Sequence, residues 1–369
     1  MATTHEHAFG TGRPFSLGAE EELFLVDPVN GRMVNSSAAV TERLASAMGG
    51  IERELHAGMI EFVSDVCATA PDVIGQLAHR RAACLGTGVG LLGSGTHPTA
   101  TDDQAEISDK ARYERVHRLL GAAVSTPVAG LHVHVGMPDA ETAVRVFNAM
   151  RTHLPLLQGL AANSPYRHGI DTGLASARGV TISSWPRSGV PRALRDYEDF
   201  CEMTDLLTRA AGVDDYTWFW WKLRPHPKLG TVEIRTLDSQ SSLQDTEALV
   251  SLTHCLARAA ADQDPADDLP TELLEEGMFR AARFGVRAEL PDGHGRLHPF
   301  QEVLDAALAS AQPYAGELGC EQGIARIPAL VAGGGGAGRQ RSVHSISGID
   351  SLLRDLIATT AATSRITQR

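Results

Sequence analysis

The sequence predicts an α+β fold, because segments with strand-like alternation and longer segments with helical spacing occur without a regular βαβ order. Alternation of apolar and polar residues, or recurring β-branched residues, predicts three strands, at residues 17–26, 131–136 and 230–237. Apolar residues at intervals of three and four predict five helices, at residues 70–85, 141–159, 244–261, 299–318 and 349–364. No repeat or shift in composition marks a boundary, so we expect a single domain spanning residues 1–369.

Local signals support these elements in order along the chain. The first strand alternates within LGAEEELFLV, and Pro71 lies in the first turn of the next helix, where proline is tolerated. The later strands read LHVHVG and GTVEIRTL. Residues 164–191, rich in Gly, Ser, Arg and Pro, are too long for a plain connector and predict an active-site wall. Residues 333–338, GGGGAG, predict a flexible hinge before the last helix, and this hinge would close over a bound nucleotide.

Composition excludes several classes of protein. The chain has 33 Lys and Arg against 45 Asp and Glu, a net charge of −12, so no basic field would attract nucleic acid or anionic lipid. Its five cysteines form no CxxC pair, and no stretch of about 18 apolar residues occurs. We therefore expect a cytoplasmic soluble protein with reduced thiols, no nucleic-acid partner and no membrane span. A homodimer is the expected assembly if the chain associates.

Two short motifs place possible metal ligands on single strand faces. Glu20 and Glu22 are two residues apart, so both carboxylates project from one face while Glu21 points away. His132 and His134 share a face in the same way. Alternating glutamates are most often a solvated face, and a structural histidine pair is about as common as a ligand pair, so both interpretations stay open for each motif.

Further acids and arginines lie on other expected strands. Glu61 lies within the apolar run MIEFV, where a buried carboxylate needs a cation or hydrogen bonds. Glu233 and Arg235 share a strand face, which is typical of a local ion pair. Arg224 follows four aromatic residues in WFWWKLRP, which also suits a core strand with an incidental arginine. Glu54 would face away from Glu61 unless a turn at Gly58 redirects the chain.

Other motifs lack the context that their chemistry needs. Gly88, Gly90 and Gly93 spell GxGxxG, but a helix precedes them where a dinucleotide site needs a strand. There is no GxxxxGK[ST], HExxH or GxSxG in the sequence, so P-loop, zincin and α/β-hydrolase sites have no support.

The order of these signals along the chain resembles one family. ExE, a buried acid, HxH and ExR occur in that order, together with GTHP, NSP, DTG, WPRSGVP, GTVEIRTLDSQ, RAARFG and GAGRQR. The chain resembles the carboxylate-amine ligases of the glutamate-cysteine ligase type 2 group, the YbdK-like enzymes. That resemblance implies a glutamine synthetase-like fold, a curved and mainly antiparallel sheet that forms an open half-barrel with helices on its outer face.

The resemblance also implies roles for the residues. The metal ligands would be Glu20, Glu22, Glu54, Glu61, His132 and Glu233. Arg235 would face the transferring phosphoryl group, with Glu233 beside it as the second catalytic residue. By the same resemblance, His134 would contact the substrate or the nucleotide. Independently of it, a planar guanidinium suits a carboxylate, so we expect Arg178 to bind the carboxylate that is not activated, with a surface arginine or an internal salt bridge as the alternative. We expect the nucleotide to contact Arg224, and Arg339 and Arg341 beside the Gly-rich segment, unless that segment is a plain linker.

The implied reaction is ATP-dependent formation of an amide, of the gamma-glutamyl-cysteine type, through an acyl phosphate with release of ADP and phosphate. The partners would be an amino acid or other carboxylate and a small amine, with Mg²⁺, or Mn²⁺, as the metal, because hard cations shared with phosphates prefer oxygen ligands. The alternative is a zinc- or manganese-dependent hydrolase that uses HxH and the acids. A nucleotide-binding protein without turnover is a third class. Lys222, at a position that is often acidic in relatives, leaves the identity of the substrates open.

Overall fold

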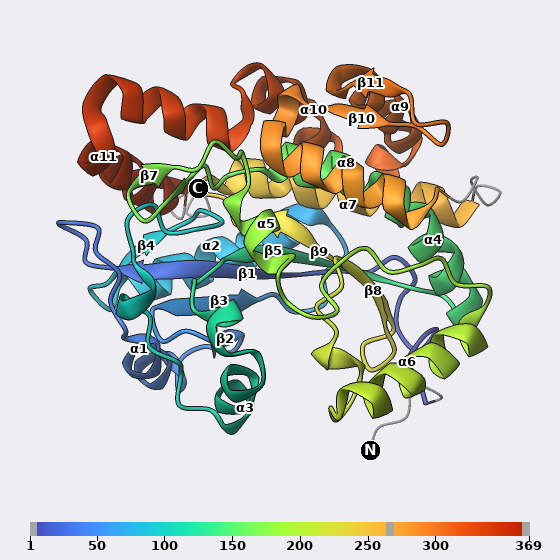
Figure 1. The fold of residues 1–369 in the computed structure, drawn as a ribbon, viewed down its shortest axis with the longest axis horizontal. Helices are drawn as coiled ribbons and strands as arrows, with labels where there is room; N and C mark the ends of the chain where they lie inside the picture. Colours follow the sequence, from blue (N-terminus) through green and yellow to red (C-terminus); the bar gives the residue numbers. More distant parts are fainter. Residues whose placement is uncertain (1–5, 263–268, 364–369) are drawn as a thin grey trace.

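A computed structural model describes residues 6–262 and 269–363, and within these ranges the centre of the fold is one seven-stranded antiparallel sheet (Figure 1). Its strands run in the order β2-β3-β1-β5-β9-β8, and β4 pairs with the second half of β1. The strands are β1 (Leu17–Val26), β2 (Ile51–Arg53), β3 (Met59–Val63), β4 (Gly90–Leu92), β5 (Gly130–Gly136), β8 (Leu223–His226) and β9 (Thr231–Asp238). The sheet is open because β2 and β8 are edges that do not pair, which confirms the predicted α+β class and antiparallel sheet.

Helices account for most of the remaining described chain. The α-helices are α1 (Ser37–Leu44), α2 (Ala70–Leu85), α3 (Ala111–Leu120), α4 (Ala140–Ala161), α5 (Ala177–Ile182), α6 (Tyr197–Ala211), α7 (Leu243–Asp262), α8 (Thr271–Phe284), α9 (Phe300–Leu318), α10 (Glu321–Ala332) and α11 (Gly335–Thr363). The short 3₁₀ helices are η1 (Asp102–Gln104), η2 (Gly121–Val124), η3 (Tyr216–Trp218) and η4 (Gly285–Arg287). Two small hairpins pair β6 (Tyr166–Arg167) with β7 (Ile170–Asp171) and β10 (Glu289–Pro291) with β11 (Leu297–Pro299). In the described part of the chain, no helix has the length and apolar character needed to cross a bilayer.

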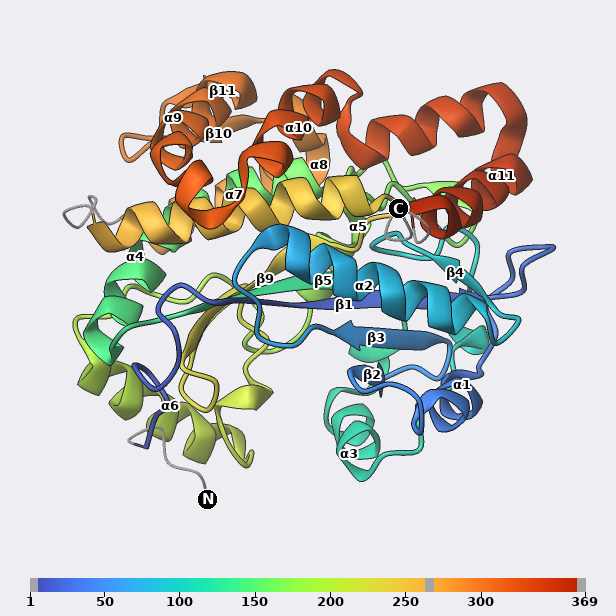
Figure 2. The ribbon, with the colours of Figure 1, turned by 180° about the vertical axis from the view of Figure 1, so that it is seen from behind.

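The two faces of the sheet are covered differently. Helices α2, α4 and α7 pack on one face, and α8, α9 and α10 form a further layer over α4 and α7 (Figure 2). Helix α11 packs against β4, where Leu352 and Leu356 meet Phe24 and Leu92. On the other side, α3 and α6 lie near opposite ends of the sheet. The central part of this second face therefore remains available for a site.

The alternation of β1 explains which residues face each layer. Leu23 and Leu25 are fully buried in the main core. Glu21 also points to the helical layer, where both of its oxygens bond with Arg81 of α2, at 2.6 and 2.8 Å. A fully buried carboxylate needs such a paired guanidinium. Glu20 and Glu22 consequently face the opposite side, as the strand periodicity predicts.

Residues 164–191, predicted to form an active-site wall, contain the β6-β7 hairpin and helix α5. The prediction of a flexible hinge at residues 333–338 is wrong, because most of this segment is helical. Helix α11 starts at Gly335 and extends, with a kink at Gly348, to Thr363. A Cβ at Gly336 would lie 2.3 Å from Asn163 Oδ1, so this glycine permits close packing. The predicted end of the last helix, Ser364, lies outside the described residues.

Candidate active site

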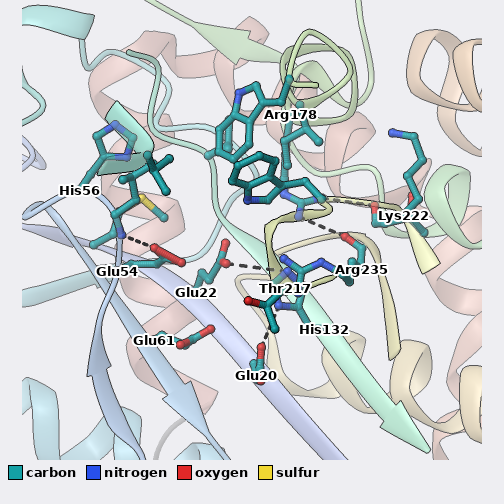
Figure 3. A pocket seen from close by; sticks show the side chains of 18 of the residues that line it. Glu20, Glu22, Glu54, His56, Glu61, His132, Arg178, Thr217, Lys222 and Arg235 are labelled. Carbon is teal, nitrogen blue, oxygen red and sulfur yellow. Dashed lines mark hydrogen bonds and ion pairs between the residues drawn. The ribbon is translucent and has the colours of Figure 1, made fainter. Parts of the chain in front are cut away.

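The second face of the sheet carries a pocket lined by acids on one side and by cations on the other (Figure 3). The acidic side of the pocket consists of Glu20, Glu22, Glu54 and Glu61, with His132 beside them. The other side includes Arg178, Lys222, Arg224 and Arg235. Acids and bases from five strands, two connecting segments and helix α5 therefore converge on one space.

The register of the sheet produces this convergence. Glu20 lies opposite His132 of β5, and Glu22 lies opposite Glu61 of β3. Glu233 of β9 lies opposite His134 on one side and Arg224 of β8 on the other. Directly opposed residues have Cβ atoms about 4.5–5.5 Å apart on the same face. Cross-strand pairing thus brings together residues that are up to about 200 positions apart in the sequence.

Glu54 joins the pocket from a turn. It follows β2, and the chain reverses before β3 begins at Met59, so the turn expected near Gly58 is present. The backbone N–H of Leu55 donates a hydrogen bond to Glu54 Oε2. The odd spacing between Glu54 and Glu61 therefore does not separate them, because Glu54 lies in the connection after β2 and Glu61 lies on β3, which runs back beside β2.

Three overlapping groups of side chains could each hold one metal ion. The groups are Glu20 with His134 and Glu233, Glu20 with Glu61 and His132, and Glu22 with Glu54 and Glu61. Within each group the candidate ligand atoms lie within 4.8 Å of one another. All six predicted metal ligands belong to these groups, and His134, predicted to contact substrate, belongs to the first. Carboxylate oxygens dominate every group, as Mg²⁺ and Mn²⁺ sites require.

His132 is oriented as a ligand would be. Its Nδ1 lies 3.0 Å from Glu20 Oε2, and its Nε2 faces Glu22 Oε1 at 3.8 Å. Burial, followed by the charge of Arg235, lowers the pKa of His132 to about 4, so the ring is neutral. When Nδ1–H donates to Glu20, Nε2 presents its lone pair to the acidic side of the pocket.

The acids of the third group carry too much negative charge for their surroundings. Burial, with the charge of Glu54 next, raises the pKa of Glu22 to about 8. Burial and the charges of Glu20, Glu54 and Glu22 raise the pKa of Glu61 well above its ordinary value. Burial also raises the pKa of Glu54. The residues therefore fit a divalent cation, because a positive ion among these acids would remove both the repulsion and part of the desolvation penalty.

The first group is balanced by arginines. Burial favours the neutral form of Glu233, but the charges of Arg224, Arg235 and His134 hold the pKa of Glu233 well below its ordinary value. Arg224 Nε lies 2.5 Å from Glu233 Oε2, and Arg235 donates to Glu233 Oε1. Glu233 and Arg235 thus form the ion pair that their spacing suggested. The Arg235 side chain also lines the pocket.

A bulge in β9 places two successive residues on this face. Leu131 pairs with Leu237 and Val133 pairs with Ile234, so the single residue between the β5 partners opposes two residues of β9, Arg235 and Thr236. Both line the pocket. Beyond the bulge, Asp238 accepts hydrogen bonds from Asn163 N and from the hydroxyls of Ser164 and Ser176, at 2.9, 2.6 and 2.8 Å. Asp238 therefore ties the wall segment to the sheet.

The wall contributes Arg178 from the first turn of α5. Its Nη1 and Nη2 donate to the backbone oxygens of Thr236 and Arg235, at 3.3 and 3.2 Å. Its Nε is buried without a hydrogen-bond partner among the described residues. A Cβ at position 130 would lie 2.2 Å from Nη2, so Gly130 gives the guanidinium its space. The predicted active-site wall thus lines the pocket with Arg178, together with Gly179, Ile182 and Trp185.

Two predicted nucleotide contacts are not brought to the pocket. Arg339 donates to Asp355 and to Thr359, 2.6 Å from its Oγ1. Arg341 bonds with both oxygens of Asp171, at 2.7 and 2.8 Å, and with the backbone oxygen of Leu174. These contacts hold α11 to its own second half and to β7, and neither arginine is among the pocket's lining residues. The Gly-rich composition suggested a lid over the nucleotide. In the structure both guanidinium groups instead make the contacts that hold α11 in place.

Some lining residues had no role assigned from the sequence. They are His56, Tyr113, Gln158, Trp185, Thr217, Trp220, Lys222 and Thr236. For Lys222 a signal existed, because it lies two residues before Arg224 and so shares a face with it on the approach to β8. Thr236 lies at the bulge in β9, and the other residues come from helices and turns whose distance from the sheet a sequence does not give.

Comparison with known proteins places the chain in a family. Residues 16–350 match the model of glutamate-cysteine ligase family 2 (GCS2). A protein of Rubrobacter xylanophilus named "Putative glutamate--cysteine ligase 2-1" is 36% identical over 346 residues, which cover 90% of this chain and 91% of that protein. A protein named "Putative glutamate--cysteine ligase 2" from Gloeobacter violaceus is 32% identical over 359 residues, covering 94% and 95% of the two chains.

Two solved structures share the fold. Glutamate-cysteine ligase of Francisella tularensis, in complex with AMP, superposes with a TM-score of 0.73 at 14% identity and covers 96% of this chain and 90% of its own. A bifunctional glutathione synthetase of Pasteurella multocida gives a TM-score of 0.67 at 16% identity and covers 95% of this chain and 52% of its own. At these identities the likeness establishes the fold, and the match over residues 16–350 establishes that the chain belongs to glutamate-cysteine ligase family 2.

Proposed function

We propose that the chain is an ATP-dependent carboxylate-amine ligase that forms an amide bond of the gamma-glutamyl-cysteine type. Membership of a glutamate-cysteine ligase family supports the reaction class, and the AMP bound to the Francisella tularensis relative of the same fold supports an adenine nucleotide as co-substrate. The single observation that carries the proposal is the convergence of Glu22, Glu54 and Glu61 in one buried pocket that also contains Arg235.

The acidic groups would hold Mg²⁺, or Mn²⁺, through Glu20, Glu22, Glu54, Glu61, His132 and Glu233, with His134 adjoining Glu233. When bound, the ions would neutralise the phosphates of ATP and the charge that develops during phosphoryl transfer. Zinc is less well matched, since no group contains a thiolate or more than one histidine.

The reaction would proceed in two steps. A carboxylate oxygen of the acid substrate attacks the γ-phosphorus, and the bond between that phosphorus and the bridging oxygen breaks to release ADP. The amine nitrogen then attacks the acyl phosphate, phosphate leaves, and the proton lost from nitrogen passes to a carboxylate of the pocket.

Arg235 and Glu233 would act as a pair in the first step. The buried Glu233 accepts a hydrogen bond from Arg235 and would thereby fix the guanidinium. A fixed positive charge aimed at the phosphoryl oxygens stabilises the transition state more than the ground state. Arg224 would hold Glu233 from its other side and lie near the nucleotide at the edge of the pocket.

The test is a matrix of carboxylic acids against amines, scored by ATP-dependent phosphate release and by product mass. The proposal predicts ADP formation that requires both an acid and an amine, abolished by chelation and by Glu61→Gln. The matched control is Glu42→Gln, because Glu42 is exposed on α1 away from the pocket. Metal-dependent hydrolysis of an amide without ATP would instead support the hydrolase, and nucleotide binding without any turnover would support a binding protein.

A further inference from the structure

Two segments from opposite edges of the sheet meet at the open side of the pocket (Figure 1). One is helix α3, which is attached to edge strand β2 because Lys110 Nζ and Tyr113 Oη both donate to Arg53 O, at 3.0 and 2.8 Å. The other is the segment 212–218, which leads toward edge strand β8. Tyr113 and Thr217 line the pocket from these two sides.

Four residues join the two segments, and we call them the latch. Arg112 Nη2 donates to the backbone and hydroxyl oxygens of Thr217, at 3.2 and 3.1 Å. Arg115 Nη1 lies 2.6 Å from Asp214 Oδ2. The guanidinium carbons of both arginines also lie 5.0 and 4.8 Å from the ring centroid of Trp218, within the range of cation–π attraction. The latch thus connects the two edges that the sheet leaves unpaired.

The two sides of the latch are anchored differently. Trp218 is 1% exposed and belongs to the main core, which fixes the segment 212–218. Among the described residues of α3, in contrast, only Val116 is buried. Helix α3 starts after Lys110 without a side-chain cap and ends at Gly121, where φ is 54° and a Cβ would meet nothing within 4 Å. A glycine in open space permits the change in backbone angles that a hinge needs, so α3 is the side that can move.

The latch itself is exposed to water. The side chain of Arg115 is 41% exposed and that of Asp214 is 65% exposed. Ion pairs with this exposure contribute little to stability and are screened by salt. The latch can therefore open without unfolding the segments that it joins.

The size of the pocket indicates that it must open. Its volume is about 220 Å³, whereas pockets for small molecules commonly have roughly 300–1,000 Å³. The proposed reaction brings a nucleotide, an acid and an amine into this one space. The structure therefore describes a closed pocket that has to widen before its substrates enter.

We propose that α3 is a gate over the pocket, hinged at Lys110 and Gly121 and held shut by the latch. This inference rests on the proposed function for the identity of the ligands that pass the gate. The open gate admits ATP and releases ADP, and the closed gate keeps water from the acyl phosphate. Water that reached this intermediate would attack it and give back the acid and phosphate, so that ATP would be consumed without an amide.

The first experiment measures acrylamide quenching of tryptophan fluorescence in wild type, Arg115→Met and Asp214→Asn. Trp185 and Trp220 line the pocket, so an open gate exposes them to the quencher and raises the quenching constant of both variants. Mg²⁺–ATP should associate with each variant about two to five times faster, because loss of one exposed ion pair changes the open population by roughly that factor.

The matched control is Arg118→Met, which removes an exposed arginine of the same helix. Arg118 lies 3.6 Å from Glu114, one turn away on α3, and makes none of the latch contacts. Its quenching constant and association rate should equal those of wild type. Melting curves verify that all three variants are folded, as expected for changes at exposed ion pairs.

The second experiment closes the gate covalently. In a double variant with Arg115→Cys and Asp214→Cys, a short bis-methanethiosulfonate reagent bridges the two new thiols, and a reductant releases them. The five native cysteines are buried, so wild type treated with the same reagent is the control. We expect the bridged protein to lose both Mg²⁺–ATP binding and quenching of the pocket tryptophans, and the reductant to restore both.

The outcomes separate the gate from the proposed function. Wild-type quenching and association rates in both Arg115→Met and Asp214→Asn would overturn the gate, and so would binding of Mg²⁺–ATP to the bridged protein at the rate of the unbridged double variant. In the ligase assay the two variants should release more phosphate than amide, and equal yields would overturn the role of the gate in excluding water. Quenching that rises in the variants and falls on bridging, in a protein that neither binds ATP nor forms an amide, would uphold the gate and refute the proposed function.

Discussion

Glu22→Gln tests whether the pocket acids require a cation. In the metal-free protein burial and the charge of Glu54 raise the pKa of Glu22 from 4.5 to about 8. A folded-state pKa above the unfolded value means that the group stabilises the fold below pH 4.5, and that this stability is lost as the pH rises toward 8. The amide is neutral at every pH and can still accept the 2.5 Å hydrogen bond from the backbone N–H of Gly130.

The magnitude follows from this pKa difference. Between pH 4.5 and pH 7 the unfolded chain gives up the proton while the folded chain keeps it, which costs about 3 kcal/mol at roughly 1.4 kcal/mol per pH unit. In chelator at pH 7 the variant should therefore unfold about 4 °C above wild type, and near pH 4.5 the two should coincide. Mg²⁺ should raise the melting temperature of wild type at pH 7 and have a smaller effect on the variant.

The assay is thermal unfolding from pH 4.5 to pH 8, in chelator and in Mg²⁺, with Glu42→Gln as the matched control. A variant that melts at or below the wild-type temperature in chelator at pH 7 would refute the reasoning. The conclusion would then be that Glu22 is ionised in the metal-free fold, compensated by Arg178 and the hydrogen bond from Gly130, which act in that direction.

Three further variants address other parts of the fold. Arg235→Met should stay folded, because Arg224 still pairs with Glu233. The rate of acyl-phosphate formation should fall about a hundredfold, while the affinity for ATP is retained. A lower melting temperature with normal turnover per folded molecule would show that the Arg235–Glu233 pair is only structural. Arg341→Ala should leave the KM of ATP unchanged and cost at most about 1 kcal/mol in thermal unfolding, since the residue is in a partly exposed ion pair, and a raised KM would return it to the nucleotide site. Gly336→Ala should lower the melting temperature, because the new Cβ would meet a side-chain oxygen at 2.3 Å, whereas unchanged stability would mean that α11 can shift.

Strand periodicity was enough to predict which face each ligand occupies. Glu20 and Glu22, like His132 and His134, lie on the pocket face because alternate residues on a strand project to the same side. The family resemblance supplied the statement that these strands adjoin, which a single sequence cannot give. Register is decided by packing between strands, and it is register that places Glu20 beside His132 and not beside a neighbour two residues away.

The bulge in β9 marks the limit of such reasoning. A regular strand through Glu233 and Arg235 would turn Thr236 and Leu237 to opposite faces from those observed beyond the irregularity. With the extra residue, Leu237 returns to the core while Thr236 lines the pocket. The sequence GTVEIRTLD does not predict the added residue, because a bulge depends on the partner strand as much as on the sequence of the bulged strand.

Glycine composition was misleading for a different reason. Gly333 to Gly338 suggested flexibility, yet Gly336 is needed where α11 passes close to Asn163, and the N–H of Ala337 bonds with Ala162 O at 3.0 Å. Glycine permits mobility and close approach alike. Only the position of a neighbouring backbone decides between the two, and that neighbour is more than 170 residues away along the chain.

The division of the pocket into an acidic and a cationic side follows from the overall charge of the protein. A chain with a net charge of −12 repels ATP and carboxylates at long range, so attraction must come from groups concentrated at the site. In the proposed reaction the acidic side would attract divalent cations, which carry positive charge to the phosphates, while the cations that line the other side, Arg178, Lys222 and Arg235, would act directly on anionic oxygens. Negative charge would then move from the carboxylate onto the phosphoryl oxygens and the departing ADP, that is, toward the acidic side. The separation of charge that would gather the substrates would therefore also stabilise this transfer.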